Sequence, residues 1–464
     1  MYNEDRGDYL LEHKVISGSQ KSKINNADLK TSSSSPSLVL DDYHIGVSEI
    51  AGDNNAAIDL EYLALFPASI TDAQATQIRN YINNRNNVFY SWDTDGYYFY
   101  NPQDLSSGAV TTWNGRIVGS DNGDADKNAT QSTSADQPTS DGYKVTFADN
   151  TDHFDIPSTT QAGWQVVGTS LGTFAYKVNA NAVTELNLLG NLGSASYRKA
   201  GDLYGIILLP ESATGREINE AKKLLTDRGA SVSATGAVTS AWRNRDDIVQ
   251  FDGGDMSGVT YAYRSWKFCS SLTSFNTPLP SATDVTEAWQ GCSSLESFSS
   301  ALPSVTSVSN AWQDCASLQS FSTELPLVTN AYAAWYQCTS LQSFSTELPL
   351  AGRMRFSWYQ CTSLTDFSAD VFANWNPSSI VSGVFDQAWD GCTSLTAQSV
   401  ENILTSIDAS GKYATSTGLS GGTALADAGI DIDYNGDPLS AATTAAITSL
   451  KAKGWSIFIN SVEQ

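Results

Sequence analysis

The stretch AWQDCASLQSFSTELP, at residues 311–326, decides the fold of this chain. Its skeleton of Trp, two residues, Cys, one residue, Ser and Leu returns every 23 residues from Cys269 to Cys361 and after 31 residues at Cys392. A fixed period of this length is typical of a solenoid, in which each unit buries its apolar face against its neighbours. The repeated side chains are therefore expected to form inward-facing columns: Trp266, Cys269, Leu272, Trp289, Cys292, Leu295, Trp312, Cys315, Leu318, Trp335, Cys338, Leu341, Trp358, Cys361, Leu364, Trp389, Cys392 and Leu395.

Each unit is expected to contain two short segments. The phrase Ser-Leu-x-Ser-Phe predicts a short strand with Leu and Phe turned inward, and Ala-Trp-x-x-Cys predicts a tight helical turn with Trp and Cys on one side. The Leu-Pro phrase ends the strand ladder, because Pro cannot donate a backbone hydrogen bond. Over residues 260–396 these units resemble leucine-rich repeats of the BspA-like type. The resemblance implies a solenoid over residues 248–396, built from units of roughly 23 residues.

The six cysteines and the repeated tryptophans each allow two interpretations. Cysteines at one position of a repeat are expected to be small buried hydrophobes. A metal site is the alternative, but metal ligands come in close pairs such as C-x-x-C, and no such pair occurs here. The tryptophans are expected to be core residues, with a ladder that stacks on sugar rings as the alternative. The core interpretation is favoured for both residue types.

Charge and hydropathy exclude two classes of partner. Asp and Glu outnumber Lys and Arg by 50 to 26, which gives a formal net charge of −24. Such a chain repels phosphate groups, so no nucleic acid partner is expected. Its apolar runs are far shorter than the ~20 residues that cross a bilayer, so no membrane insertion is expected. The start, Met1 to Arg6, lacks the features of a secretory signal, which predicts assembly in a cytoplasm.

The first part of the chain divides by composition. Residues 1–37 have no sustained periodicity and end in a Ser-rich run before Pro36, which predicts an arm or linker. Residues 38–89 predict short strands, a turn at Pro67 and a helix that begins after an N-cap at Thr71.

Residues 90–232 are expected to form an all-β module. Short runs of Val, Tyr, Phe and Ile alternate there with turn residues, the pattern of an antiparallel sandwich. At residues 203–230 a strand, a Pro turn and a helix follow, with Thr214 and Glu217 as a capping box. The phrases resemble the concanavalin A-like (laminin G-like) jelly-roll modules of bacteriophage virion proteins. Residues 38–89 match only the closing half of another copy. The resemblance rests on Trp113-Asn114-Gly115, Asp121-Asn122-Gly123, Asn128 to Ser132, Gln137-Pro138 and Val145-Thr146-Phe147.

Residues 397–464 are expected to cap the open end of the solenoid with an α/β segment. Helices are predicted over 397–407 and 440–451, and a strand over 455–459. The dipeptide Asn435-Gly436 predicts a hairpin. The fold class is thus mainly β with short helices: an antiparallel sandwich (jelly roll), a leucine-rich-repeat solenoid and an α/β cap.

Residues that break the repeat are the candidate receptor contacts. Arg353, Met354, Arg355 and Phe356 replace a Thr-rich pattern at positions that are expected to point outward, with an irregular loop tip as the alternative. The long last spacing adds an insert around Trp375, which is a further candidate.

Two acidic stretches allow a calcium site. Asp121, Asp124 and Asp126 lie in a loop where laminin G-like modules sometimes hold calcium, with a solvated acidic loop as the alternative. The stretch from Asp431 to Asp437 imitates the first half of a calcium loop. Because its twelfth position lacks the required Glu, the hairpin is favoured there.

The sequence contains no complete catalytic motif. None of the three histidines lies near a nucleophile motif, and no Walker loop or zinc helix occurs. We expect no enzymatic activity and no cofactor other than possible calcium. A pair of carboxylates facing a cleft, as in a glycosidase, stays open, because 50 acidic residues are present.

The two resemblances together imply a structural protein on the surface of a bacteriophage virion. It would be a tail fibre, appendage or capsid-surface fibre that contacts other virion proteins and a glycan or protein receptor on the host. A homo-oligomer is expected, with a trimer as the form that fibres often take. The alternatives are a bacterial cell-surface adhesin and a phage polysaccharide depolymerase.

Overall fold

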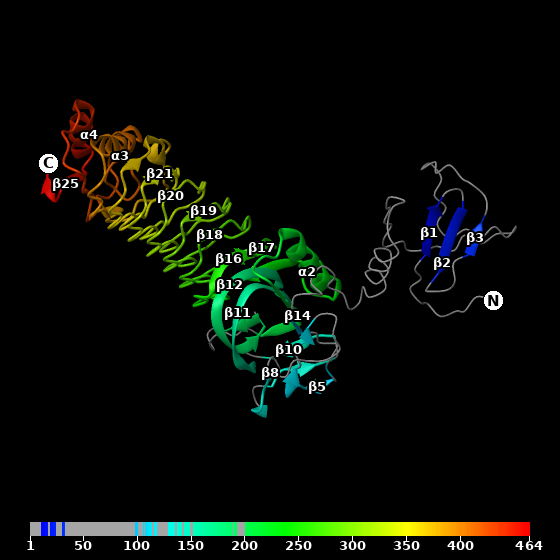
Figure 1. The fold of residues 1–464 in the computed structure, drawn as a ribbon. Helices are drawn as coiled ribbons and strands as arrows, with labels where there is room; N and C mark the ends of the chain where they lie inside the picture. Colours follow the sequence, from blue (N-terminus) through cyan, green and yellow to red (C-terminus); the bar gives the residue numbers. More distant parts are fainter. Residues whose placement is uncertain are drawn as a thin grey trace. The chain divides into compact units, whose positions relative to one another are not determined.

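A computed structural model of the chain describes residues 11–16, 19–24, 30–32, 98–100, 105, 107–113, 116–117, 129–134, 137–141, 143–148, 152–188, 190–192 and 200–464. These residues form a mainly β fold with 3 short helices and several sheets (Figure 1). The chain divides into two compact units, residues 1–93 and residues 94–464.

The first unit contains a small antiparallel sheet. Its strands are β1 (Leu11–Ile16), β2 (Ser19–Ile24) and β3 (Lys30–Ser32), in the order β1-β2-β3. These strands lie within residues 1–37, for which the sequence predicts an arm or linker. Because the strands are short and mostly polar, their pairing leaves little hydrophobic periodicity in the sequence. The strands and helix predicted over residues 38–89 lie outside the described residues.

The second unit begins with an antiparallel sheet around two long strands. Strands β11 and β12 pair with each other and curve strongly (Figure 1), and β14 joins the other edge of β11, followed by β10 and β9. The described strands over residues 90–202 are thus antiparallel, as predicted. The bounds are β4 (Tyr98–Tyr100), β5 (Gly108–Ala109), β6 (Thr112–Trp113), β7 (Arg116–Ile117), β8 (Ala129–Thr130), β9 (Thr139–Ser140), β10 (Val145–Phe147), β11 (Phe154–Thr169), β12 (Gly172–Asn187), β13 (Gly190–Leu192) and β14 (Gly201–Leu209).

The strand and capped helix predicted over residues 203–230 are confirmed. Strand β14 is followed by helix α2 (Gly215–Asp227), whose N-cap is Thr214. The Thr214 side chain accepts from the backbone N–H of Glu217, and the Glu217 carboxylate accepts from the backbone N–H of Thr214 at 2.7 Å. This reciprocal capping satisfies two backbone donors that the first helical turn leaves free.

The antiparallel sheet continues into the repeats without a break. Strand β16 (Ile248–Asp252) pairs with β12 antiparallel on one side and with β18 (Ser274–Phe275) parallel on the other. Strands β15 (Ser233–Ala237) and β17 (Asp255–Tyr261) form a parallel pair nearby. One continuous hydrophobic core runs from Val110 to Ile459. Trp242 already stacks on Trp266, with 5.4 Å between ring centroids, so the Trp column begins before the expected start of the repeats near Ile248.

The repeats form stacked coils, each with one two-residue strand. These strands are β18, β19 (Ser297–Phe298), β20 (Ser320–Phe321), β21 (Ser343–Phe344) and β22 (Asp366–Phe367), and neighbouring strands pair in parallel except between β19 and β20. A second column of parallel bridges joins Tyr261, Asp284, Ser307, Asn330 and Arg353. Backbone pairing therefore holds each coil to the next at more than one point.

The turn around each Trp is not the helical turn that was predicted. The residue two positions before Trp and the residue just before Cys both adopt positive φ, for example Asn310 at 55° and Asp314 at 60°. Left-handed residues interrupt a right-handed helix. They instead direct alternate backbone N–H groups at the next coil, so that Val285, Glu287, Trp289 and Gly291 donate to the carbonyl groups of Ser307, Ser309, Ala311 and Gln313.

The C-terminal segment closes the stack. The 3-10 helix η5 (Ala369–Phe372) and strand β23 (Phe385–Trp389) precede helices α3 (Ala397–Ala409) and α4 (Ala441–Ala452), close to the predicted bounds. Strands β24 (Gly429–Ile432) and β25 (Ser456–Ile459) pair in parallel, and β26 (Val462–Glu463) follows. The hairpin predicted at Asn435-Gly436 is therefore wrong. Ile430 and Ile457 are buried on the parallel strands β24 and β25, and α4 lies in the connection between them.

Carboxylates of this segment satisfy the last donors of the turn ladder. The backbone N–H of Gln387 donates to Asp431 Oδ2, and that of Gly391 donates to Asp433 Oδ2, both at 2.9 Å. No further coil follows to accept these bonds. The acidic stretch that imitates a calcium loop thus ends the ladder, since two of its carboxylates bond backbone N–H groups.

Candidate functional site

The repeated Trp and Phe rings fill the inside of the stack. Trp rings of neighbouring coils lie 5.1 to 5.6 Å apart between centroids and nearly parallel, and each also meets Phe rings edge-on. The indole N–H groups of these stacked rings have no hydrogen-bond partner among the described residues. Ring contacts and burial therefore hold the stack. All repeated Trp, Cys and Leu side chains are 0% exposed, so these Trp rings are not open to a sugar.

The repeated thiols also have a structural role. Each Sγ lies 3.0 to 3.2 Å from the carbonyl oxygen of the Trp one coil earlier, to which it donates. All six cysteines are free and buried. Burial raises the pKa of the thiols of Cys269, Cys292, Cys315, Cys338 and Cys361. Neutral thiols that bond carbonyl groups are not arranged as metal ligands, which are thiolates.

The outward side of the turns differs from coil to coil. We call it the turn face and define it by the residues three before, two before and one after each Trp. Along the stack its composition changes from ionic through amide to aromatic, and in the last coil to acidic. In chain order its members are Tyr263, Arg264, Lys267, Thr286, Glu287, Gln290, Ser309, Asn310, Gln313, Tyr332, Ala333, Tyr336, Arg355, Phe356, Tyr359, Asp386, Gln387 and Asp390.

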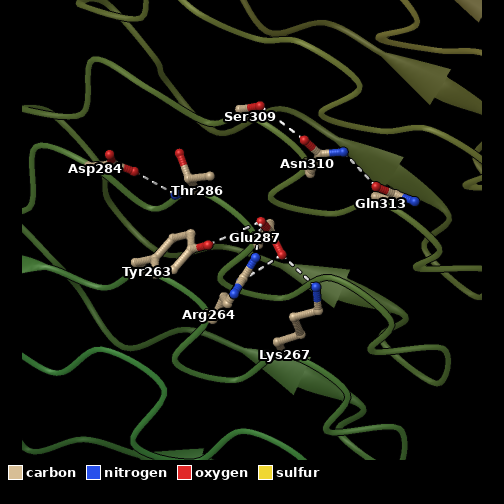
Figure 2. Close-up of polar contacts among 9 residues, drawn as sticks. All are labelled: Tyr263, Arg264, Lys267, Asp284, Thr286, Glu287, Ser309, Asn310 and Gln313. Atoms are coloured by element: carbon tan, nitrogen blue, oxygen red, sulfur yellow. Dashed lines mark hydrogen bonds and ion pairs between the residues drawn. The ribbon is translucent and has the colours of Figure 1, made fainter.

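The ionic end of the turn face centres on one carboxylate. Figure 2 shows Glu287 between Arg264 and Lys267, and Arg264 forms two bonds of 2.9 Å with it. Tyr263 Oη also donates to Glu287, at 3.4 Å. Burial raises the pKa of Glu287, but the hydrogen bonds and charges of Arg264 and Lys267 outweigh it, so the pKa lies below its usual range. The cations at this end are therefore neutralised within the protein.

An amide chain follows in the next coil. Ser309 Oγ donates to Asn310 Oδ1 at 3.0 Å, and Asn310 Nδ2 donates to Gln313 Oε1 at 2.5 Å, as Figure 2 shows. Gln313 Nε2 then donates to Asp314 Oδ2 at 3.2 Å. These bonds fix the orientation of both amide groups. Each amide nitrogen keeps a second hydrogen that these bonds do not use.

Beyond the amides the turn face is hollowed. A cavity of about 340 Å³ opens there over four consecutive coils. Its volume is in the range of small-molecule sites. Aromatic rings and amides line it: Asn310, Gln313, Tyr332, Ala333, Tyr336, Phe356, Tyr359 and Gln387.

The small side chain of Ala333 accounts for the hollow. Ala333 occupies the same turn position as Asn310 in the coil before and Phe356 in the coil after, and all three have positive φ. A methyl group stands where its neighbours carry an amide or a phenyl ring. The small residue leaves space between them.

The aromatic rings around the hollow support one another. Tyr336 and Tyr359 stack at 4.9 Å between centroids with 12° between planes, and Phe356 meets Tyr359 edge-on at 5.8 Å. Phe356 also meets Tyr332 edge-on at 5.9 Å. All four rings are half-buried. Such packing fixes the orientation of the rings.

The structure divides the four residues predicted as one receptor patch. Phe356 lines the hollow, and the guanidinium of Arg355 lies 4.7 Å above its ring and pairs with Asp386. Arg353 is exposed, with its guanidinium 4.9 Å from the ring centre of Tyr332. The expectation that Met354 points outward is wrong, because alternate residues of this bridged segment face inward and Met354 is 0% exposed.

The other candidate residues do not join this site. Trp375 is 1% exposed, and its indole Nε1 donates to the carbonyl oxygen of Ala351 at 2.7 Å. It belongs to the core under the cap and is not presented to a receptor, which corrects that prediction. The possible calcium ligands Asp121, Asp124 and Asp126 lie outside the described residues.

Most of the hollow was not singled out from the sequence. The signal that would have found it is a comparison of units at the same turn position, since tyrosines stand one residue after Trp only in the units of Trp335 and Trp358. The same comparison finds Trp242, because Trp242, Arg245, Ile248 and Phe251 match the next unit at a spacing of 24 residues.

No family model, curated protein or solved structure matches this chain. Among the described residues no His, Cys, Asp and Glu side chains gather in the groups of ≥ 3 that could hold a metal ion. In the same part of the chain no helix has the length and apolar character needed to span a bilayer.

Proposed function

We propose that this chain is a non-enzymatic structural protein of a bacteriophage virion that contacts the host surface through the hollow of its turn face. It is placed in a tail fibre, appendage or capsid-surface fibre, beside other virion proteins. The observation that carries the proposal is the contrast between an interior that repeats from coil to coil and a hollow on the turn face that depends on the particular side chains around Ala333.

The modules of the proposal follow the two resemblances. Residues 90–232 are assigned to a concanavalin A-like jelly roll, supported by the antiparallel strands β10, β14, β11 and β12. Residues 248–396 are assigned to a BspA-like leucine-rich-repeat solenoid, supported by parallel two-residue strands at a fixed spacing. The shared core from Val110 to Ile459 supports a stiff body that would hold the hollow at a fixed distance from the particle.

Immunogold labelling of particles tests this placement. Antibodies raised against residues 200–464 are applied to particles purified from a culture that makes the chain. We expect gold on the particle surface and peptides of the chain in the particle proteome. Absence of the chain from the purified particles contradicts the virion assignment, and its presence on the producing cell instead supports a surface adhesin.

A depolymerase is the enzymatic alternative. Incubation of the full chain with capsular polysaccharide or lipopolysaccharide from the host tests it. The proposal predicts no increase in reducing ends over a buffer control. Release of reducing ends contradicts the non-enzymatic assignment.

A further inference from the structure

We propose that the hollow above Ala333 binds a neutral pyranose ring of a saccharide chain. The proposal rests on the proposed function, because it names the chemistry of the receptor that this site contacts. It concerns the hollow only and not the buried Trp rings of the interior.

The lining matches the two kinds of surface on a pyranose ring. One face of such a ring presents C–H groups, which pack on aromatic rings, and its edge presents hydroxyl groups that donate and accept hydrogen bonds. Tyr336 and Phe356 supply aromatic surface, while Asn310, Gln313 and Gln387 supply amides at the margin. An apolar ligand would cover the second amide hydrogens of Asn310 and Gln313 without offering them an acceptor, which is unfavourable.

The charges around the hollow favour a neutral ligand. None of its lining residues is charged. Arg355 pairs with Asp386 at 2.6 Å, so its charge is met within the protein. The chain as a whole carries a net charge of −24, which repels acidic polymers. Arg353, a second exposed cation, lies over Tyr332 and outside the lining.

The backbone at the hollow is already paired, which argues against an extended peptide as the ligand. The backbone N–H groups of Asn310 and Ala333 donate to the carbonyl oxygens of Tyr332 and Arg355 in the next coils. A peptide that adds to a sheet needs a free edge of backbone donors and acceptors. Recognition at this place therefore depends on side chains.

Ala333 is the residue that decides whether the ring fits. Asn310 shows that this turn position accepts Asn with a φ of 55°. Ala333→Asn therefore fills the hollow with a side chain that the fold already tolerates in the preceding coil. Ala316→Thr is a matched control in that preceding coil, because Thr339 and Thr362 occupy the equivalent position in the next two units.

Saturation-transfer NMR on the full chain tests the proposal. The probes are the methyl glycosides of glucose, mannose, galactose and N-acetylglucosamine, with methyl glucuronide as the acidic comparison. We expect transfer to the ring C–H protons of at least one neutral glycoside. We expect at least a tenfold loss of affinity in Ala333→Asn and in Tyr336→Ala, and binding close to wild type in Ala316→Thr and in Tyr336→Phe, which keeps the ring.

Three results would overturn the proposal. They are no transfer to any neutral glycoside, transfer that Ala333→Asn leaves unchanged, and tighter binding of the glucuronide than of every neutral glycoside. Circular dichroism of each variant separates a lost site from a lost fold. The particle labelling is independent of these spectra. Gold on the particles without sugar binding would support the virion assignment and contradict the saccharide proposal. Sugar binding without gold on the particles would support the saccharide proposal and contradict the virion assignment.

Discussion

The interior of the coils and their turn face obey opposite rules. Inside, the same Trp, Cys, Leu and Phe return in each unit from that of Trp266 to that of Trp358, and their contacts repeat almost without change. On the turn face the same backbone positions carry Arg264, Glu287, Asn310, Ala333 and Phe356 in successive coils. The ladder of backbone hydrogen bonds holds the interior and the turn face together, so the outer side chains can vary without loss of the fold. The interior therefore supplies stability, and the turn face is free to supply recognition.

Thiol reactivity gives the largest expected difference between the two regions. The reactive species of a cysteine is the thiolate, and burial raises the pKa of at least five of these thiols. We expect iodoacetamide at pH 8 to leave all six cysteines unmodified in the native protein and to modify all six in guanidinium, as measured by mass spectrometry. Rapid native labelling of one repeated Cys contradicts a closed interior.

Truncation of a side chain inside the stack should lower the free energy of unfolding far more than truncation of one on its surface. Trp312→Ala removes a ring that stacks on Trp289 and Trp335, and we expect a loss of about 3–5 kcal/mol in the free energy of unfolding. Gln319→Ala, at an exposed position of the same coil, should change it by less than about 0.5 kcal/mol. Urea unfolding followed by circular dichroism measures both. Equal losses would remove the distinction between the regions.

Substitutions that relieve the backbone strain at Ala333 should raise the stability of the fold. Ala333 has a φ of 50°, a region that Gly and Asn adopt more readily than Ala. We expect Ala333→Gly and Ala333→Asn to raise the free energy of unfolding by about 0.5–1 kcal/mol. The neighbouring Ala334 is buried without positive φ, so Ala334→Gly should lower it by about 1 kcal/mol. A loss of stability in both Ala333 variants contradicts the strain.

The contributions of Glu287 and Asp431 to the stability of the fold should change with pH in opposite directions. The lowered pKa of Glu287 stabilises the fold above the ordinary value of 4.5, and this contribution is lost as the pH falls. Burial, then repulsion by Asp386 and Asp427, raises the pKa of Asp431 despite the bond from Gln387. Its contribution is complete below the ordinary value of 3.8 and is lost as the pH rises through the raised pKa.

Two variants test these signs. At pH 7 we expect Glu287→Gln to lower the urea midpoint, by up to about 1 kcal/mol in free energy, and Asp431→Asn to raise it slightly, since Asn keeps an acceptor for Gln387. Both differences should shrink as the pH falls, because protonation removes the charge that distinguishes each carboxyl group from its amide replacement. A destabilising Asp431→Asn at pH 7 would show that its carboxylate is needed to end the ladder.

The interior was predictable because one period governs it. Trp312, Cys315 and Leu318 are recognised by repetition alone, and their burial follows. The first coil escaped notice because Arg245, which pairs with Asp247, stands where the other units have Cys. The helices of the cap were predictable because each begins after an N-cap residue. The hairpin prediction at Asn435-Gly436 was wrong because tertiary packing of the flanking strands overrides a local turn preference.

The hollow was not predictable from single residues. It arises from a small side chain at Ala333 between larger neighbours, and a single alanine forms no recognisable motif. The positive φ values at Ala333 and Phe356 also carry no Gly or Asn signal, since the turn ladder of the neighbouring coils imposes them. Of the predicted patch, Phe356 lines the hollow, and the Arg355 guanidinium lies over the Phe356 ring. Met354 is buried because a bridged segment alternates inward and outward side chains.

The most direct test of the central claim is a crystal structure of the full chain with the neutral glycoside that binds best in solution. A repeated interior and a variable turn face predict a sugar ring in the hollow over Ala333, in contact with Tyr336, with the Trp column unchanged. A ring bound elsewhere, or a hollow that stays empty at a saturating concentration, would contradict the assignment of recognition to this face.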